Sequence, residues 1–225
     1  HSVAGHGLDS SDRDDEIAIE PRPLRGIYMP DGIESYSAGG STYLVTANEG
    51  DAREWGDYVE PARIKDLGSD GLAPVCEDSP AADLLADEEL GRLTVSTASG
   101  LSEDGTCYEE LYSFGGRSFS IWTTDGEQVF DSGDDFERIT ALADPAHFNS
   151  NHTESNLEGR SDDKGPEPEN VAIGRVGDST YAFVGFERVG GIAVYDITTP
   201  AESSFVTYVN NRDFSVADPE ADLAG

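Results

Sequence analysis

Basic residues are scarce in this chain of 225 residues, and lysine is almost absent. The sequence has 14 Lys plus Arg against 46 Asp plus Glu, and its formal net charge is −32. Its only lysines are Lys65 and Lys164. Contact with phosphate backbones needs clustered Lys and Arg, which this composition does not supply. The sequence therefore predicts no nucleic-acid partner, and an anionic membrane is a poor partner as well.

The excess of acids and the preference for arginine over lysine resemble proteins of salt-loving organisms. Concentrated salt screens the repulsion between carboxylates, and dilute buffer does not. We therefore expect a halophilic-type protein whose stability rises with added salt. Hydrophobic residues still make up 36% of the chain, so it is predicted to fold with an acidic surface.

Long apolar runs are missing too. No stretch of about 18 apolar residues occurs, so the sequence predicts no membrane span. No secretion signal is visible, and the chain begins at His1 without a methionine and ends at Gly225. We expect a trimmed or internal piece of a longer protein, so the missing signal does not decide the localisation.

Only two cysteines are present, Cys76 and Cys107, and they lack the spacing and the nearby histidine of a zinc site. Two interpretations remain open at this point. The cysteines form a disulfide that pins a surface excursion, or they are two free thiols. A disulfide would place the protein in an oxidising compartment.

Helix signals are sparse, and the best candidate covers residues 79–90, where leucines follow Pro80 at roughly helical spacing. The other apolar segments are short and bounded by turn residues, which is typical of strands. An all-β fold is predicted, with strands near residues 16–20, 41–46, 119–122, 168–174, 180–186, 190–197 and 204–209.

The segment after Glu167 forms the clearest unit, with four predicted strands within about 45 residues, the size of one propeller blade. A second copy lies 138 residues earlier. Pro30 precedes Glu49 by 19 residues, and Pro168 precedes Glu187 by the same distance. The matched spacing predicts two copies of one structural repeat.

We therefore predict a partial β-propeller with about three blade-like units, near residues 16–52, 92–135 and 167–212. Polar insertions at residues 53–91 and 144–165 separate them. Propellers typically have four to eight blades, so three do not close a ring. The chain either belongs to a larger propeller or assembles with copies of itself, and we favour the larger propeller.

Several sequence motifs resemble the choice-of-anchor I domain family, and the likeness runs from about residue 7 to residue 212. The motifs are YMPDGI at 28–33, TANEGDAR at 46–53, GRSFSI at 116–121, RSDDKGPEPE at 160–169 and FERVGGI at 186–192.

The resemblance implies a secreted or surface-anchored microbial β-propeller protein, related to the mesenchyme-specific cell-surface glycoproteins of animals. Some members carry the label alkaline phosphatase. Members of the family are considerably longer than this chain, and they usually have Gly where this sequence has Asn170. A complete active site is therefore not expected within these residues.

Acidic side chains recur at equivalent ends of the repeated strands. If the first strand of each unit lines a central axis, they converge at one mouth of the channel, where like charges repel unless a cation or a proton intervenes. Such oxygen ligands suit Ca²⁺, with Mg²⁺ or Mn²⁺ as alternatives. The competing interpretation is a solvated acidic rim. The predicted ligands are Asp31, Glu34, Glu49, Asp51, Glu167, Glu169 and Glu187.

Arg53 and Arg188 closely follow two of these acids. We interpret them first as ion-pair partners, and alternatively as a bidentate clamp for a phosphate beside the metal. The later polar insertion offers further oxygen ligands without the spacing of an EF-hand, and we interpret it as a polar loop before a second calcium site. Its candidate ligands are Asn149, Asn151, Asn156, Asp162 and Asp163.

Two functions follow from these observations. The first is an extracellular, calcium-stabilised surface or interaction module whose partner is a protein, a glycan or a phosphoester ligand. The second is a metal-dependent phosphoesterase in which a metal-bound water attacks phosphorus. No nucleophile motif of the hydrolase type occurs, but a metal-dependent phosphoesterase needs none.

Overall fold

Strands form most of the regular structure. The computed structural model describes residues 1–219, and in these residues the strands make three four-stranded sheets and one two-stranded hairpin, none of them closed into a ring or barrel. The chain is therefore all-β, as predicted. Within the same residues, no helix is long and apolar enough to cross a membrane.

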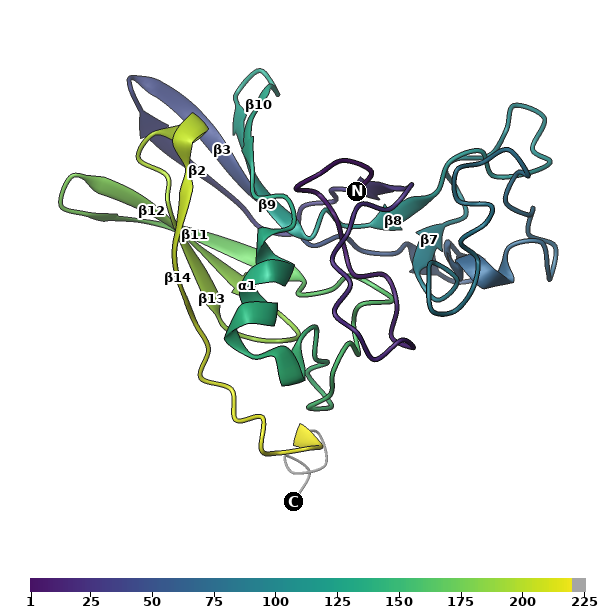
Figure 1. The fold of residues 1–225 in the computed structure, drawn as a ribbon. Coiled ribbons are helices and arrows are strands. Elements are labelled where there is room, and N and C mark those ends of the chain that lie inside the picture. Colours follow the sequence, from purple (N-terminus) through teal and green to yellow (C-terminus); the bar gives the residue numbers. More distant parts are fainter. Residues whose placement is uncertain (220–225) are drawn as a thin grey trace.

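Two of the sheets lie together and fan out from a common point (Figure 1). The first repeat sheet has the order β10-β9-β3-β2, and the C-terminal repeat sheet has the order β11-β12-β13-β14. Both are antiparallel throughout. Their strands are β2 (Ile33–Ala38), β3 (Ser41–Asn48), β9 (Ser118–Thr123), β10 (Gln128–Asp131), β11 (Pro168–Val176), β12 (Ser179–Phe186), β13 (Ile192–Asp196) and β14 (Ser204–Val209).

The two repeat sheets share one hydrogen-bonding register. Ile33 pairs with Thr46 in the first sheet, and Val171 pairs with Val184 in the second, at positions 138 residues apart. Each fourth strand also has a bulge at the equivalent step, where the pairing skips Val129 in β10 and Val206 in β14. The repeat predicted from spacing is therefore a repeat of structure.

The unit predicted at residues 92–135 is not a sheet of its own. Its strands β9 and β10 complete the sheet that β2 and β3 begin. The connection between the second and third strands is residues 49–117 in the first repeat sheet and only residues 187–191 in the other. This long insertion divides one repeat into two pieces of sequence, so the spacing suggested two units.

Residues 53–114 of the insertion, together with β1, build a separate lobe, which Figure 1 shows to one side of the repeat sheets. Its sheet has the order β1-β8-β7-β6, in which β1 and β8 are parallel. The lobe also contains a two-stranded hairpin and one 3-10 turn. The elements are β1 (Arg25–Ile27), β4 (Glu54–Trp55), β5 (Tyr58–Val59), β6 (Pro61–Arg63), η1 (Ile64–Asp66), β7 (Thr94–Ser96) and β8 (Tyr112–Phe114).

The lobe contains the disulfide. Cys76 and Cys107 are bonded to each other across 31 residues of sequence, so neither is a free thiol. The backbone beside the bridge is paired as well, because the Cys76 N–H donates to the Tyr108 carbonyl and the Tyr108 N–H donates to the Pro74 carbonyl. The first interpretation of the two cysteines is confirmed.

The helix predicted at residues 79–90 is wrong. The segment makes separate turns: the Leu84 N–H donates to the Ala81 carbonyl, and the Leu90 N–H reaches back to the Leu84 carbonyl. Ala81 and Leu90 are fully buried in the lobe. The apolar pattern reflects this burial, and burial does not require a continuous helix.

The α-helix of the described residues lies elsewhere, at α1 (Asp135–Ala143). Phe136 on this helix is fully buried against the repeat sheets, while Leu142 on the opposite side is 86% exposed. Two short 3-10 turns, η2 (Pro145–His147) and η3 (Pro200–Glu202), complete the helical elements.

The N-terminal segment makes no strand at residues 16–20, contrary to our expectation. Leu8 and Glu20 form a single bridge through two backbone hydrogen bonds. Beyond this bridge, the Asp9 N–H donates to a carboxylate oxygen of Glu137 on α1 at 2.9 Å. The segment therefore packs against the helix and joins no sheet.

Two hydrophobic cores hold the chain together. One lies between the repeat sheets and α1, and the other lies inside the lobe. The first comprises Tyr36, Val45, Ala47, Phe119, Ile121, Phe136, Val171, Ala182, Val184, Phe186, Val189, Ala193, Tyr195 and Ile197. The second comprises Leu8, Leu24, Ile64, Ala81, Leu90, Leu93, Val95, Tyr108 and Leu111.

Candidate functional site

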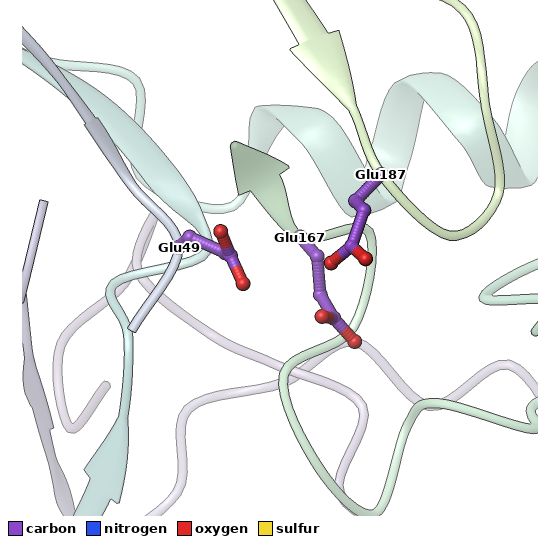
Figure 2. A group of neighbouring side chains, drawn as sticks. All are labelled: Glu49, Glu167 and Glu187. Carbon is purple, nitrogen blue, oxygen red and sulfur yellow. The ribbon is translucent and has the colours of Figure 1, made fainter. Parts of the chain in front are cut away.

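Three of the predicted metal ligands come together where the two repeat sheets meet. Glu49 follows β3 and Glu187 follows β12, at equivalent places of the structural repeat, and Glu167 immediately precedes β11. One carboxylate oxygen of each lies within 4.8 Å of the others. Figure 2 shows Glu49 facing the other two from the side of β3. We call this group and its cationic neighbours the charge cluster.

Three cations from two loops are bonded to these acids. Lys164 Nζ lies 2.6 Å from Glu49 Oε1 and 3.2 Å from Glu167 Oε2. The guanidinium of Arg160 binds Glu167, and Arg188 Nε lies 3.1 Å from both Glu167 and Glu187. The charge cluster thus holds three carboxylates and three cations, so its formal charges balance.

The local backbone explains how Glu167 reaches this position. Its φ of 54° lies in the left-handed region, which directs the fully buried side chain into the loop that carries Arg160 and Lys164. Lys164 Nζ also donates to the Gly50 carbonyl at 2.9 Å. Gly50 has a φ of 83°, and a Cβ there would lie 2.0 Å from the backbone of Gly115. Only glycine fits at this crossing.

The pKa values follow from burial and from these charges. Burial opposes ionisation of Glu167, but the charges of Arg160, Lys164 and Arg188 outweigh it and lower its pKa. For Glu49, burial has the larger effect and raises the pKa despite Lys164. Burial opposes the charged form of Lys164 too, yet the nearby carboxylates raise its pKa. Glu167 and Lys164 are therefore stabilised in their charged forms.

The other four predicted ligands lie outside the charge cluster. Asp31, Glu34, Asp51 and Glu169 are exposed, and none belongs to the group of converging carboxylates found in residues 1–219. Asp31 is still close enough for its charge to contribute to the raised pKa of Glu49. The structure thus brings together Glu49 and Glu187, one pair that the repeat aligned, and leaves the other aligned pair, Asp31 and Glu169, outside the cluster.

The two predicted arginines are ion-pair partners. Arg53 makes a bidentate pair with Glu60, with Nε to Oε2 at 2.6 Å and Nη2 to Oε1 at 2.7 Å. Glu60 is almost fully buried and also accepts a hydrogen bond from Ser96. Arg188 belongs to the charge cluster. Arg188 pairs with predicted strand-end acids, as in our first interpretation, whereas Arg53 pairs with Glu60, an acid outside the predicted set.

The polar loop at residues 144–165 is held by its own side chains and its neighbours. Asp162 accepts ion pairs from Arg63 and Arg92. Asn156 Oδ1 accepts the Asn151 N–H at 3.1 Å. These contacts are those of a structured polar loop. Among the candidate ligands in this loop, Asn149 alone is fully buried.

The donors in the charge cluster decide how well it suits a metal ion. Glu49 Oε1 and both oxygens of Glu167 already accept hydrogen bonds from cationic side chains. A divalent ion among them would have to displace Lys164 Nζ, which contacts two of the three acids. The residues fit a balanced ion-pair network better, and a metal at this place stays a prediction.

Sequence reasoning did not identify Arg160 and Lys164 as parts of this site. Both lie in the motif at residues 160–169, where Arg160 and Lys164 alternate with Asp163 and Glu167 at spacings of three. That alternation was the available signal, because residues three apart in a turn can pair.

The amino-acid sequence is similar to those of known proteins. The sequence model of the choice-of-anchor I domain matches residues 1–200. The chain is 42% identical to Gigasin-3a of Magallana gigas over 120 residues, which are 50% of this chain and 42% of that protein. It is 29% identical to the mesenchyme-specific cell surface glycoprotein of Strongylocentrotus purpuratus over 224 residues, which are 86% of this chain and 29% of that protein.

The chain thus spans less than half the length of either of these curated relatives. No solved structure matches it.

Proposed function

Because the chain belongs to the choice-of-anchor I domain family, we propose that it is a segment of a larger extracellular protein and serves as an interaction module at a cell surface. The observation that carries this proposal is the disulfide of the lobe, since such bridges persist in oxidising compartments. The name of the sea-urchin relative, a cell surface glycoprotein, supports the same location.

The two repeat sheets support a propeller, with each sheet as one blade. They share a register and a bulge, and their first strands lie against each other. A Cβ on Gly32 beside β2 would lie 2.8 Å from the Cα of Asn170 in β11. Neighbouring blades meet in this way around an axis, and the charge cluster joins them at one end of the contact.

The C-terminal repeat sheet has an apolar outer face that suits a further blade. Ala193 is fully buried on the inner face, whereas Ile192 next to it in β13 is 47% exposed, and its cross-strand partner Val209 is 61% exposed. Paired apolar residues on a sheet face normally pack against another layer. The remaining length of the parent protein would supply that layer.

An exposed aromatic pair supports a role in interaction. Trp55 is 63% exposed on the β4–β5 hairpin of the lobe, and its ring stacks on Tyr58 with centroids 4.9 Å apart. Aromatic side chains held rigidly at a surface are typical of contact sites. We assign partner contact to this hairpin.

A metal-dependent phosphoesterase has less support. Both arginines considered for a phosphate are engaged by acids, Arg53 by the buried Glu60 and Arg188 by the buried Glu167 and the exposed Glu187. A phosphate would have to compete with carboxylates that are already aligned.

The test of the location is antibody labelling of intact cells of the source organism, with a cytoplasmic protein as the control. We expect labelling without permeabilisation, and no alkylation of Cys76 or Cys107 when the protein is denatured without reductant. Labelling that requires permeabilised cells would contradict the proposal.

The propeller is tested by the association state of the isolated chain, measured by light scattering after gel filtration. The uncovered outer face predicts self-association that the double variant Ile192→Lys, Val209→Lys abolishes. A wild-type chain that stays monomeric at every concentration would argue against a missing neighbour blade.

A further inference from the structure

A second group of buried acids lies away from the charge cluster, where the N-terminal segment meets α1 and the polar loop. Asp9 and Asn149 are fully buried, and Glu158 is 2% exposed. Glu137 of α1 is buried beside them. We call Asp9, Glu137, Asn149 and Glu158 the acidic pocket. Sequence reasoning singled out only Asn149 among these residues.

Ser161 ties two of these side chains together. Its hydroxyl donates to Asp9 Oδ2 at 2.9 Å and accepts a hydrogen bond from Asn149 Nδ2 at 2.9 Å. The Ser161 N–H in turn donates to the Glu158 carbonyl. The side chains of Asp9 and Asn149 therefore meet at Ser161, and Glu158 lies one turn before Ser161 in the same loop.

Glu137 is fully engaged. Its Oε1 accepts from Arg117 and from Asn149 Nδ2, and its Oε2 accepts the Asp9 N–H. Arg117 uses its other donors on the backbone carbonyls of Asp9, Ser161 and Asp163. The single cation of the acidic pocket is thus committed to Glu137 and to the backbone.

Three oxygens in the acidic pocket have no hydrogen-bond donor. They are Asp9 Oδ1, Asn149 Oδ1 and Glu158 Oε1, each shielded from solvent. A buried acceptor without a partner is destabilising, and more so when it is charged. These three oxygens are therefore available to contact a cation.

The formal charges of the acidic pocket show how much negative charge is left unbalanced. Asp9, Glu137 and Glu158 contribute three negative charges, and Arg117 contributes one positive charge. Asp14 adds to the negative potential, because its charge acts on both Asp9 and Glu158. Two negative charges inside the pocket are left without a counterion.

The pKa values of Asp9 and Glu158 reflect the same excess of negative charge. Burial, followed by the charge of Glu137, raises the pKa of Asp9 to about 7. Burial, followed by the charges of Asp9 and the aspartates at positions 12–15, raises the pKa of Glu158 to about 8. A divalent cation would remove the electrostatic part of both shifts.

We propose that Asp9 Oδ1, Asn149 Oδ1 and Glu158 Oε1 bind one divalent cation, and that this cation is Ca²⁺. The donor set is oxygen only and mixes carboxylates with a neutral amide, which is typical of calcium ligation and unlike that of zinc or copper. Water and the carboxylate of Asp14 complete the coordination. The bound ion fastens the N-terminal segment to the polar loop.

The test is calorimetric titration of the metal-free chain with CaCl₂ in about 1 M NaCl, which suppresses diffuse binding to the acidic surface. We expect one saturable site and a higher melting temperature with calcium. Glu158→Gln should weaken calcium binding at least about tenfold, since affinity follows the ligand charge. Glu110→Gln, which alters an exposed ion pair with Arg25 outside both acid groups, is the control and should bind calcium like the wild type. Glu187→Gln tests the charge cluster as the alternative calcium site.

Folding is controlled within the same experiment. Without calcium, Glu158→Gln should melt at or above the wild-type temperature, because it removes an unpaired buried charge. Asp9→Asn is a second variant with the same expectation. The proposal is overturned if no saturable site is found, if Glu158→Gln and Asp9→Asn bind calcium as the wild type does, or if only Glu187→Gln loses binding. MgCl₂ binding as tight as that of CaCl₂ would overturn the assignment to calcium.

Discussion

The charge cluster and the acidic pocket each hold three carboxylates, although Glu187 of the charge cluster is exposed, and they differ in what neutralises them. The charge cluster has one cation for each acid, whereas the acidic pocket has a single arginine. In a chain with 46 acids, the number of carboxylates at a place says little about cation binding. The balance between buried acids and buried bases is the informative quantity.

The largest effect should come from removing a cation of the balanced group. Lys164→Met leaves Glu49 without its ion-pair partner and weakens the network around Glu167. Breaking a buried pair from one side typically costs about 3 kcal/mol. We expect a loss of that size in the free energy of unfolding, measured by urea denaturation.

The other lysine of the chain is the matched control. Lys65 pairs with Asp87 at 3.0 Å, but both side chains are more than a third exposed. Lys65→Met should therefore lower stability by less than about 1 kcal/mol. Equal losses for the two lysine variants would mean that the charge cluster does not differ from an ordinary surface pair.

The buried acid Glu60 extends the comparison, because it lies outside both groups and has one cation of its own. Arg53→Ala should lower stability at pH 7 by less than Lys164→Met does, since Glu60 is 1% exposed but the guanidinium is half exposed. The hydrogen bonds from Arg53 lower the pKa of Glu60 to about 2, opposed by burial.

The sign of the pH effect follows from that shift. A lowered carboxyl pKa contributes stability above the unfolded value, and this contribution is lost as the pH falls toward the folded value. The difference between wild type and Arg53→Ala should therefore be full at pH 7 and clearly smaller at pH 3. A difference that grows on acidification would contradict the pairing. Arg25→Ala, in the exposed pair with Glu110, is the control.

Neutralising one acid in each group should have opposite effects in calcium-free buffer at pH 8. Glu167→Gln removes a carboxylate whose pKa is lowered by three cations despite its burial, so stability should fall. Glu158→Gln removes a carboxylate whose pKa is raised by burial and by like charges, so stability should rise. We expect changes of opposite sign in the free energy of unfolding, measured by urea denaturation. The same sign for both variants would remove the distinction.

Salt should produce the smallest change in this comparison. Added NaCl screens exposed acids and should raise the melting temperature of wild type and Lys164→Met alike. The difference in stability between the two should change by less than about 0.5 kcal/mol between dilute and molar salt, because buried pairs are screened little. A melting temperature that ignores salt would refute the halophilic-type prediction.

The repeated part of the fold was predictable, and the inserted part was not. The hairpins β2–β3 and β11–β12 carry the same residue spacing, so their register could be read from sequence. Strand β3 pairs with β9, and the inserted lobe lies between these two strands in the sequence. No local sequence pattern predicts their pairing. Residues 79–90 show the same limit of sequence-based prediction, because the spacing of their leucines predicts burial but does not distinguish a helix from separate turns.

The acids of the charge cluster were predictable for the same reason. Glu49 and Glu187 occupy equivalent strand ends, and the repeat brings them together. The neutralisation of Glu49 by Lys164 and of Glu167 by Arg160 depends on the path of a loop outside the repeat. The acidic pocket depends even more on tertiary structure, because Asp9 and Glu158 meet only after the N-terminal segment packs on α1.

The insertion between β3 and β9 also has a consequence for the order of folding. In the C-terminal repeat sheet each strand pairs with its neighbour in sequence, so this sheet has local contacts and can form early. The first repeat sheet needs closure of a loop of residues 49–117, which is slower while that loop is unstructured. Folding of the lobe brings the ends of β3 and β9 together. The lobe therefore acts on the rate at which the first repeat sheet forms, and its disulfide makes that rate sensitive to the redox state of the compartment in which the chain folds.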